Sequence, residues 1–222
     1  MPQNRAKEQE NWWTQVMNYD IADAAIKDMN RRNLRAFDGL KTMKFDELNV
    51  MRMVTKVYDN SVKIAKKRYC RIAEEAYLEA LILAGVNREK AEKLTEETID
   101  DDWVLDMLED YDALTLYSFV NETERKKQRT AEAILAAHDK VAEVDKALKL
   151  WTQQIAQYAD NSVYYATVDG YEKAGVKKVE WVTEKDGRVC GTCHRLDGKV
   201  FDIDKIPPRP HINCRCILIP AK

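Results

Sequence analysis

The sequence contains few residues that interrupt helices, with only 7 glycines and 5 prolines among its 222 residues. Four of the prolines lie after residue 180, where Gly187 and Gly198 are also found. Glycine and proline mark turns and loops, so their concentration in one region indicates a change of architecture. This change predicts two domains, a helical body over residues 1–175 and a cap domain over residues 176–222.

Long apolar runs and a strong net charge are also absent. The longest uninterrupted apolar stretch, around residues 80–86, is far too short to span a membrane, and the first residues lack the apolar core of a secretory signal. Lys and Arg together number 36 and Asp and Glu 38, which gives a net charge of −2. This balance does not favour non-specific binding to nucleic acid. We therefore expect a folded protein with no membrane-spanning segment.

Cysteine is scarce as well, and its distribution is uneven. The chain has 5 cysteines, four of which lie between residues 190 and 216. An odd number of clustered cysteines in a chain with no export signal argues against a disulfide framework. Reduced thiols or thiolate ligands of a metal ion are favoured instead.

The predicted helical body shows apolar residues at steps of three and four, which is the periodicity of amphipathic helices. The predicted helices cover about residues 5–40, 46–84, 88–99, 113–129 and 130–174. Gly85 is expected to end the second of these helices and Asn87 to cap the third. Gly175 is expected to close the last one, within which residues 160–162 are a candidate restart.

Two shorter features complete the body. The three aspartates at residues 100–102 predict a turn or the acidic first turn of another helix, where carboxylates interact favourably with the helix dipole. The residues expected on the buried face of that helix are Trp103, Val104, Met107 and Leu108.

After Gly175 the period changes from that of a helix to that of a strand. Residues 176–182 are β-branched and aromatic and alternate with charged residues, which predicts a strand. Asp186-Gly187 indicates a turn, residues 196–201 predict a second turn that leads into a strand, and residues 217–219 predict a third strand. The expected fold is therefore mainly α, an elongated helical body with a small C-terminal β-rich (α+β), zinc-binding cap.

The metal prediction rests on two half-sites with zinc spacing. Cys190-x2-Cys193 and His211-x2-Cys214 each place two donors in one turn, and the loop between them can return the chain to the same ion. These four residues are the first choice of ligands, and Cys216 is the alternative to His211. Four protein ligands leave no open position, so the expected zinc is structural. It would also stabilise a domain that is too small to build a large core.

Three functional alternatives and one structural alternative remain open at this point. The Cys190-x2-Cys193 pair resembles a dithiol redox site, but that chemistry needs a helix N-terminus, and the turn at Gly198 predicts too short a helix. A nuclease with His211 as base and Asn213 beside it would need a following helix, where a strand is predicted. The third alternative is a zinc-stabilised nucleic-acid-binding module, and the structural one is a set of buried, reduced cysteines.

Other conspicuous residues are given ordinary structural roles. The arginines of a nucleic-acid-binding module would be Arg188, Arg195 and Arg215, but interspersed aspartates make a solvated surface the simpler interpretation. Trp12 and Trp13 are assigned to core packing on the helical body, and Tyr164 and Tyr165 to packing between the cap and a helix. Cys70 and His138 are expected on long helices, in structural roles. His194 directly follows Cys193 and is not expected to be a ligand.

Four motifs in the C-terminal part occur in a fixed order. They are Val179-Glu180-Trp181, Asp186-x-Arg188-Val189-Cys190-x2-Cys193, Leu196-Asp197-Gly198-Lys199-Val200-Phe201 and Pro210-His211-x-Asn213-Cys214-Arg215-Cys216. This string resembles the C-terminal signature of tailed-phage minor head proteins, the head-morphogenesis family similar to the F protein of phage Mu. The specific match covers about residues 171–220.

The resemblance implies a virion protein that is present in few copies inside the phage head, near the portal, after assembly in the host cytoplasm. The implied partners are the portal protein, other head proteins and packaged double-stranded DNA. The implied function is capsid assembly and DNA packaging or delivery, with no enzymatic reaction.

Overall fold

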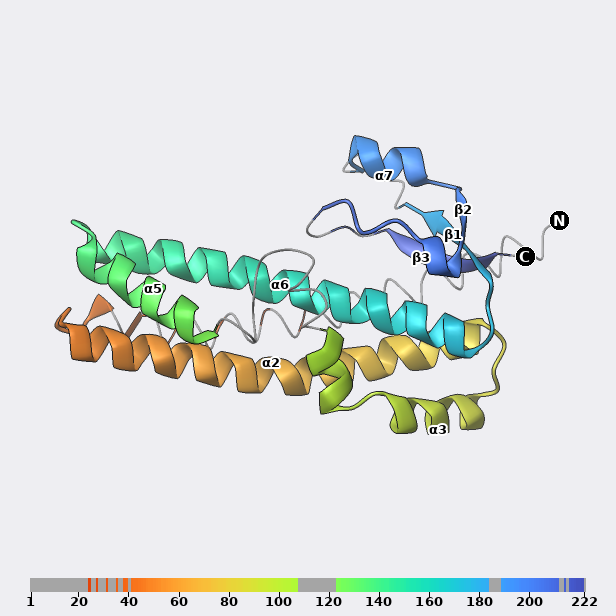
Figure 1. Ribbon diagram of the computed structural model, residues 1–222, viewed down its shortest axis with the longest axis horizontal. Helices are drawn as coiled ribbons and strands as arrows, with labels where there is room; N and C mark the ends of the chain where they lie inside the picture. The colour runs from red at the N-terminus through yellow and green to blue at the C-terminus, as the bar shows by residue number, and fades with distance from the viewer. Residues whose placement is uncertain are drawn as a thin grey trace. The chain divides into compact units, whose positions relative to one another are not determined.

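The computed structural model describes residues 24, 27, 31, 35, 38–39, 41–107, 123–183, 189–211, 214 and 216–221. Side chains are described in these ranges except at 60–66, 123–124, 148, 151–158 and 160. The elements in chain order are α2 (Glu47–Leu83), α3 (Arg88–Thr98), α5 (Thr123–Ala136), α6 (Lys140–Lys173), β1 (Lys178–Val182), α7 (Gly191–Leu196), β2 (Val200–Asp202), the short 3-10 helix η1 (Ile203–Lys205) and β3 (Ile217–Ala221) (Figure 1). The predicted mainly helical fold with a small C-terminal sheet is confirmed.

The described part of the chain forms two compact units. The first unit contains residues 70–100 and 159–221, and the second contains residues 41–69, 101–107 and 123–158. The predicted division at residue 175 follows the change in composition and stays a prediction. Among the described residues, no helix combines the length and apolarity that a membrane crossing requires.

The ends of α2 and α3 follow their sequence signals. Asp46 caps α2, since its Oδ1 accepts a hydrogen bond from the Asn49 backbone N–H at 2.9 Å. Gly85 after α2 has a φ of +95°, in the left-handed region that favours glycine. Asn87 caps α3 by accepting from the Lys90 N–H at 2.9 Å. The predicted helices over 46–84 and 88–99 are therefore confirmed.

The three aspartates at 100–102 come at the start of a helix that the structure describes up to Met107. Val104 and Met107 are buried and Trp103 is half-buried, as the helical face predicts, while Leu108 lies outside the described residues. The predicted helices over 5–40 and 113–129 fall largely outside them too.

The predicted single helix over residues 130–174 is wrong at its beginning. The chain leaves the helix after Ala136 and begins α6 at Lys140. Asp139 caps α6, because its Oδ1 accepts from the Ala142 N–H at 3.0 Å. Lys140 Nζ donates to the carbonyls of Leu135 and Ala137 at 2.8 and 2.9 Å, which satisfies the end of α5.

Two further predictions for this region are corrected by the structure. His138 is exposed between α5 and α6 and is not on a helix. The candidate restart at residues 160–162 does not occur, because α6 is continuous to Lys173. The side chains that cap the helices at the break belong to Asp139 and Lys140. The spacing of apolar residues gives no information about such polar caps.

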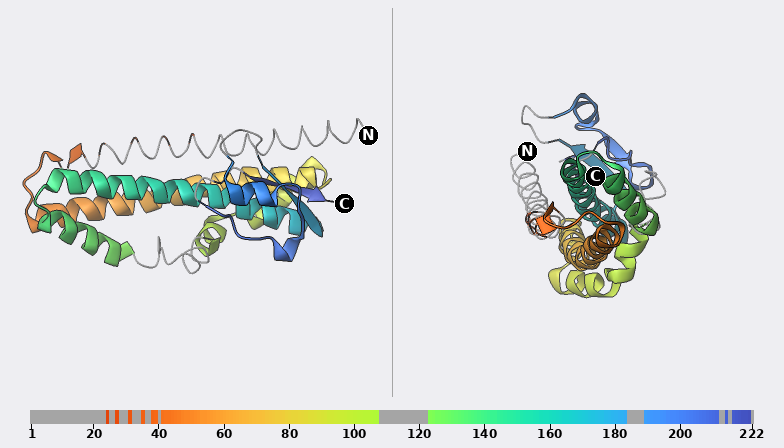
Figure 2. Two further views of the ribbon diagram at one scale, coloured as in Figure 1. Left: turned by 90° about the horizontal axis from the view of Figure 1, so that it is seen from above. Right: turned by 90° about the vertical axis from the view of Figure 1, so that its left-hand side faces the viewer.

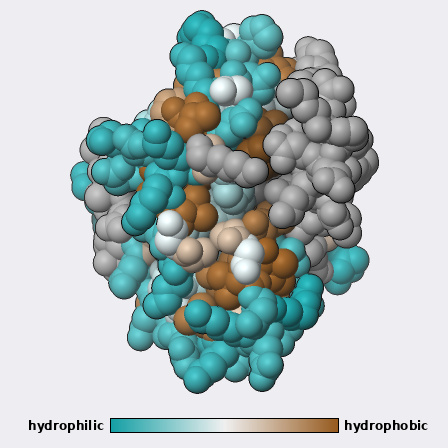
Figure 3. Space-filling model, turned by 90° about the vertical axis from the view of Figure 1, so that its right-hand side faces the viewer, coloured by the Kyte–Doolittle hydropathy of each residue, from teal (hydrophilic) through white to brown (hydrophobic). Residues whose placement is uncertain are grey.

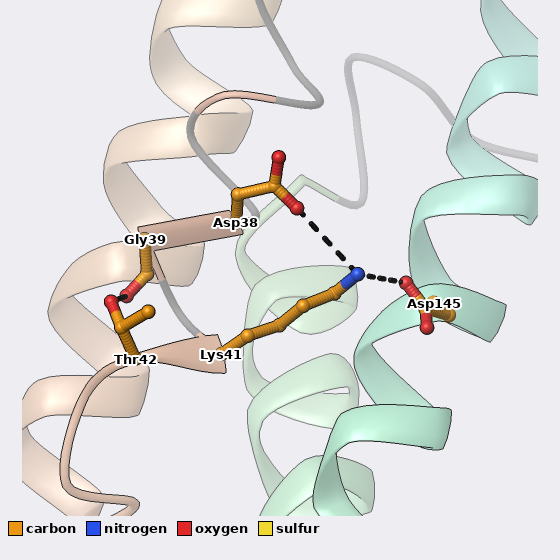
Figure 4. Close-up of polar contacts among 5 residues, drawn as sticks. All are labelled: Asp38, Gly39, Lys41, Thr42 and Asp145. Atoms are coloured by element: carbon orange, nitrogen blue, oxygen red, sulfur yellow. Dashed lines mark hydrogen bonds and ion pairs between the residues drawn. The ribbon is translucent and has the colours of Figure 1, made fainter.

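Polar contacts around Lys41 join different segments of the second unit (Figure 4). Lys41 lies between two carboxylates, with its Nζ 2.6 Å from Asp145 and 3.5 Å from Asp38. The hydrogen bond to Asp145 is the main reason that the pKa of Lys41 is raised above its ordinary value. The pair is partly solvated, so it fixes local geometry more than it stabilises the unit.

The first unit carries the three-stranded antiparallel sheet, in the order β2-β1-β3. The sheet lies alongside the C-terminal end of α6 (Figures 1 and 2). Val179 and Trp181 of β1 are buried, which confirms the alternation predicted for this strand. Tyr171 of α6 is fully buried and donates from its hydroxyl to the Leu218 carbonyl of β3 at 3.0 Å.

Apolar side chains of the cap pack together with side chains of α2 and α6. The buried cluster comprises Ala80, Tyr171, Val179, Trp181, Cys193, Cys214, Cys216 and Leu218. On the face of the molecule shown in Figure 3, apolar residues reach the surface in patches bordered by hydrophilic ones. Because the buried cluster includes residues of α2, α6 and the cap, these parts share one core.

Within the first unit, α2 and α6 approach each other closely at Gly170. A Cβ placed on Gly170 would lie 2.8 Å from the Ala80 Cβ and 3.0 Å from the Tyr77 carbonyl oxygen. Neither atom belongs to a flexible side chain. Glycine is therefore required here by packing and not by backbone conformation.

We predict that Gly170→Ala destabilises the protein. The gain in helix propensity is about 1 kcal/mol, whereas overpacking of a tight core costs roughly 1–3 kcal/mol. A net loss of about 1 kcal/mol or more should appear in denaturant unfolding followed by circular dichroism. Glu172→Ala, at an exposed position of the same helix, is the matched control and should change stability by less than about 0.5 kcal/mol. Equal or greater stability of Gly170→Ala would contradict the close approach.

Candidate metal centre

The first half-site is built by α7. Cys190 is the N-cap of this helix, and its Sγ accepts a hydrogen bond from the Cys193 N–H at 3.3 Å. The two sulfurs lie within 4.8 Å of each other. Cys193 is buried and Cys190 is half-buried. The helix that sequence analysis judged too short does form, over six residues.

The second half-site comes to the same point from the segment before β3. The Cys193 Sγ lies 3.3 Å from His211 Nε2 and 3.6 Å from Cys214 Sγ. The donors form two groups, each within 4.8 Å, namely Cys190, Cys193 and His211, and Cys193, Cys214 and Cys216. The structure therefore brings all five predicted ligands together, with Cys193 common to both groups. Their role as ligands stays a prediction.

The spacing of these donors fits a tetrahedral ion. Zinc–sulfur bonds of about 2.3 Å and zinc–nitrogen bonds of about 2.0 Å place two sulfurs about 3.8 Å apart, and a sulfur and a nitrogen about 3.5 Å apart. The observed 3.6 and 3.3 Å are close to these values. Thiolate and imidazole donors are also the types that zinc prefers. The Cys/His cluster can therefore hold a metal ion.

The cluster distributes its protons unevenly. The hydrogen bond from Cys216 is the main cause that lowers the pKa of Cys214 to about 5, and the charge of Arg209 adds to it. The same bond, followed by burial, raises the pKa of Cys216. Burial raises the pKa of Cys193 to about 12, whereas the Cys193 N–H lowers that of Cys190. A metal ion bound by several of these sulfurs must displace thiol protons, so metal binding is expected to depend on pH.

The Leu-Asp-Gly segment after α7 attaches the helix to β1. Asp197 donates its N–H to the Cys193 carbonyl at 3.1 Å, and its Oδ1 accepts from the Thr183 N–H at 2.8 Å. Gly198, with a φ of +73°, donates to the Trp181 carbonyl at 2.8 Å, and the Lys199 carbonyl accepts from the Trp181 N–H at 2.9 Å. The sequence motifs predict only a turn here. The contacts of this segment fix Cys193 relative to the sheet.

Aromatic residues of α6 complete the surroundings of the site. Tyr164 packs against the buried cluster, which agrees with the packing predicted for it, and it meets Tyr165 edge-on with ring centroids 5.6 Å apart. The Arg209 guanidinium lies 5.6 Å from the centre of the Tyr164 ring, within the range of a cation–π contact. Sequence analysis assigned no role in the site to Arg209 or to Trp181.

The remaining candidates are not part of the cluster, or lie outside the described residues. His194 is exposed on α7, and Cys70 is on α2, where its Sγ contacts Glu74. Cys214 and Cys216 lie in the segment just before β3, which begins at Ile217. The positions outside the described residues are Trp12, Trp13, Asp186, Gly187, Arg188, Asn213 and Arg215.

Comparison with known proteins matches this region to a family. The model of the family described as phage Mu protein F like protein matches residues 127–219. The match covers less than half of the chain. It confirms the resemblance stated from the sequence motifs, and it suggests a phage head-related protein and a location in the virion. Other head proteins are the partners that the family suggests. No curated protein and no solved structure gives a significant match.

We predict that Asp197→Ala loosens α7 from β1. The substitution leaves the buried Thr183 N–H without its acceptor, which costs about 1–3 kcal/mol. Metal-free, reduced protein should melt earlier and expose its thiols to a labelling reagent faster. Asp197→Asn retains an acceptor oxygen and should lose less. Asp202→Ala, at an exposed partner of Lys205, is the control with an expected change under about 0.5 kcal/mol. Wild-type labelling rates in Asp197→Ala would rule out this role.

Proposed function

We propose that the chain is a minor head protein of a tailed phage, located inside the head near the portal. It acts in head morphogenesis and in DNA packaging or delivery, and it catalyses no reaction. The match of residues 127–219 to the phage Mu protein F like family supports this proposal. The long helices α2 and α6 offer extended surfaces for the portal protein and other head proteins. Packaged double-stranded DNA is a further proposed partner.

The same proposal includes one structural zinc ion in the cap domain. The observation that carries it is the position of Cys193. Its buried sulfur lies 3.3 Å from His211 Nε2 and 3.6 Å from Cys214 Sγ, which both come from the segment before β3. The residues that would hold the ion are drawn from Cys190, Cys193, His211, Cys214 and Cys216. When bound, zinc supplies strong bonds that link α7 to the segment before β3.

The chain's own residues prepare this linkage. Cys190 fixes the N-terminus of α7, and Asp197 fixes its C-terminus to β1. Tyr171 holds β3 on α6 through the Leu218 carbonyl. The hydrogen bond of Tyr171 therefore connects β3 to α6. In this proposal the Cys/His cluster connects α7 to the segment before β3. A cap secured in this way would present a constant surface during head assembly.

A dithiol redox function is the second candidate, and one observation favours it. Cys190 is at the N-cap of α7 with a lowered pKa, as a redox-active cysteine requires. Against it, Cys193 is shared with His211 and Cys214, which a redox pair does not need. Thiol–disulfide exchange that depends on Cys190 and survives saturation with zinc would favour this candidate over the structural site.

Portal association can be tested with procapsids assembled with and without the portal protein. We expect this chain to co-sediment with portal-containing procapsids and to be lost from those without it, because the proposed contact is to the portal. Quantitative immunoblotting of gradient fractions, with the major capsid protein as the loading reference, measures this. Equal amounts in both kinds of procapsid would contradict the proposal.

The structural zinc predicts that Cys193→Ser and Cys70→Ser behave differently. Both remove one thiol, but Cys70 lies on α2, whereas Cys193 is common to both donor groups. Cys193→Ser should lose about 3 kcal/mol or more of zinc-dependent stability, roughly 6–12 °C in melting temperature for a chain of this length. Cys70→Ser should match the wild type. Thermal unfolding with and without a chelator measures both, and chelator-independent melting of the wild type would refute the structural site.

A further inference from the structure

The buried indole of Trp181 has an unused hydrogen-bond donor. Trp181 is 1% exposed, and its Nε1 has no hydrogen-bond partner in the structure. A buried donor without an acceptor costs about 1–3 kcal/mol, so few native proteins keep one without a reason. Phenylalanine would fill similar space without this cost. The N–H of Trp181 is therefore available to an acceptor placed beside it.

The sheet register places this indole beside Cys216. Trp181 of β1 pairs with Leu218 of β3, and Cys216 precedes Leu218 by two residues. Residues two apart along an extended chain lie on the same face, and diagonal neighbours across a strand pair are within reach of a large aromatic side chain. Trp181 and Cys216 also belong to the same buried cluster.

Electrostatics agree with this placement. The Trp181 N–H opposes the rise in the pKa of Cys216, which means that it favours the thiolate form. It does not yet make a regular hydrogen bond to the Cys216 sulfur. A neutral thiol is a weak acceptor, whereas a metal-bound thiolate is a strong one.

The backbone of Trp181 is held firmly enough to orient the ring. Its N–H donates to the Lys199 carbonyl at 2.9 Å, and its carbonyl accepts from the Gly198 N–H at 2.8 Å. Both partners directly follow α7, which carries Cys193. Trp181 is therefore fixed relative to the Cys193 half-site as well as to the Cys216 side. Groups that orient metal ligands in this way are typical of the outer shell of metal sites.

We infer that Trp181 is a positioning residue of the metal centre, whose indole N–H donates to the Cys216 sulfur when Cys216 binds the ion as a thiolate. This inference rests on the proposed zinc site and specifies it further. It makes Cys216 a ligand together with Cys193 and Cys214, the other two buried cysteines. The fourth position then belongs to one of the more exposed donors, Cys190 or His211.

The first test is the zinc affinity of full-length Trp181→Phe, measured by competition with a chromophoric chelator. Phenylalanine keeps most of the buried ring but removes the donor, so zinc should bind about 10–100-fold more weakly. The cobalt(II) form should also show a shifted thiolate-to-metal charge-transfer band, because the hydrogen bond to a ligand sulfur is gone. Trp103→Phe, in the second unit, is the matched control and should change neither property.

A double-mutant cycle separates this role from general packing. If Trp181 acts through Cys216, Trp181→Phe should weaken zinc binding much less when Cys216→Ser is already present. An equal loss in both backgrounds would overturn the inference. Wild-type affinity in Trp181→Phe would also overturn it while leaving the zinc site intact. A wild-type chain that binds no zinc would instead refute the proposed site itself.

A measurement on unsubstituted protein covers the case in which Trp181→Phe fails to fold. The chain has 5 tryptophans, so indole N–H signals of ¹⁵N-tryptophan-labelled protein are few enough to follow individually. Zinc should move one signal downfield, as a new hydrogen bond requires, and Cys216→Ser should abolish that movement. Unchanged indole signals in zinc-saturated wild-type protein would overturn the inference.

Discussion

The convergence of two distant turns on the Cys193 sulfur is the constraint on which the cap depends. Cys193 is buried, and donors from the segment before β3 approach it at 3.3 and 3.6 Å. The neighbouring sulfurs of Cys214 and Cys216 have pKa values displaced in opposite directions. Such an arrangement gains most from a cation that several thiolates can share. Securing this point links α7 to the segment before β3, beside the shared core of the cap.

Hydrogen bonds at or next to the strands link the sheet to α7 and to α6. Asp197 links the end of α7 to Thr183, and Tyr171 links α6 to the Leu218 carbonyl. The close approach of α2 and α6 at Gly170 then holds the two helices that support β3 and β1. A metal-secured surface on a helical support is consistent with a protein that acts by contact with other head proteins, as the family match suggests.

Local signals with a single physical cause were predictable from the sequence. Gly85 and Asn87 end and begin helices as expected, and the alternation around Val179 identified β1. Metal spacing also identified the donors that the fold brings together. The break after Ala136 was missed because side chains of Asp139 and Lys140 cap the helices there, with no glycine or proline to mark it. The surroundings of the Trp181 indole depend on strand register and the turn after α7, which no periodicity encodes.

The central claim is that the Cys/His cluster is a closed metal site, and metal content per chain tests it most directly. Protein purified without chelators should contain about one zinc per chain, with three or more thiols protected from modification until the zinc is removed. Elemental analysis combined with a free-thiol count on the same sample gives both values. Protein with no metal and a disulfide between Cys190 and Cys193 would contradict the claim and support dithiol chemistry instead.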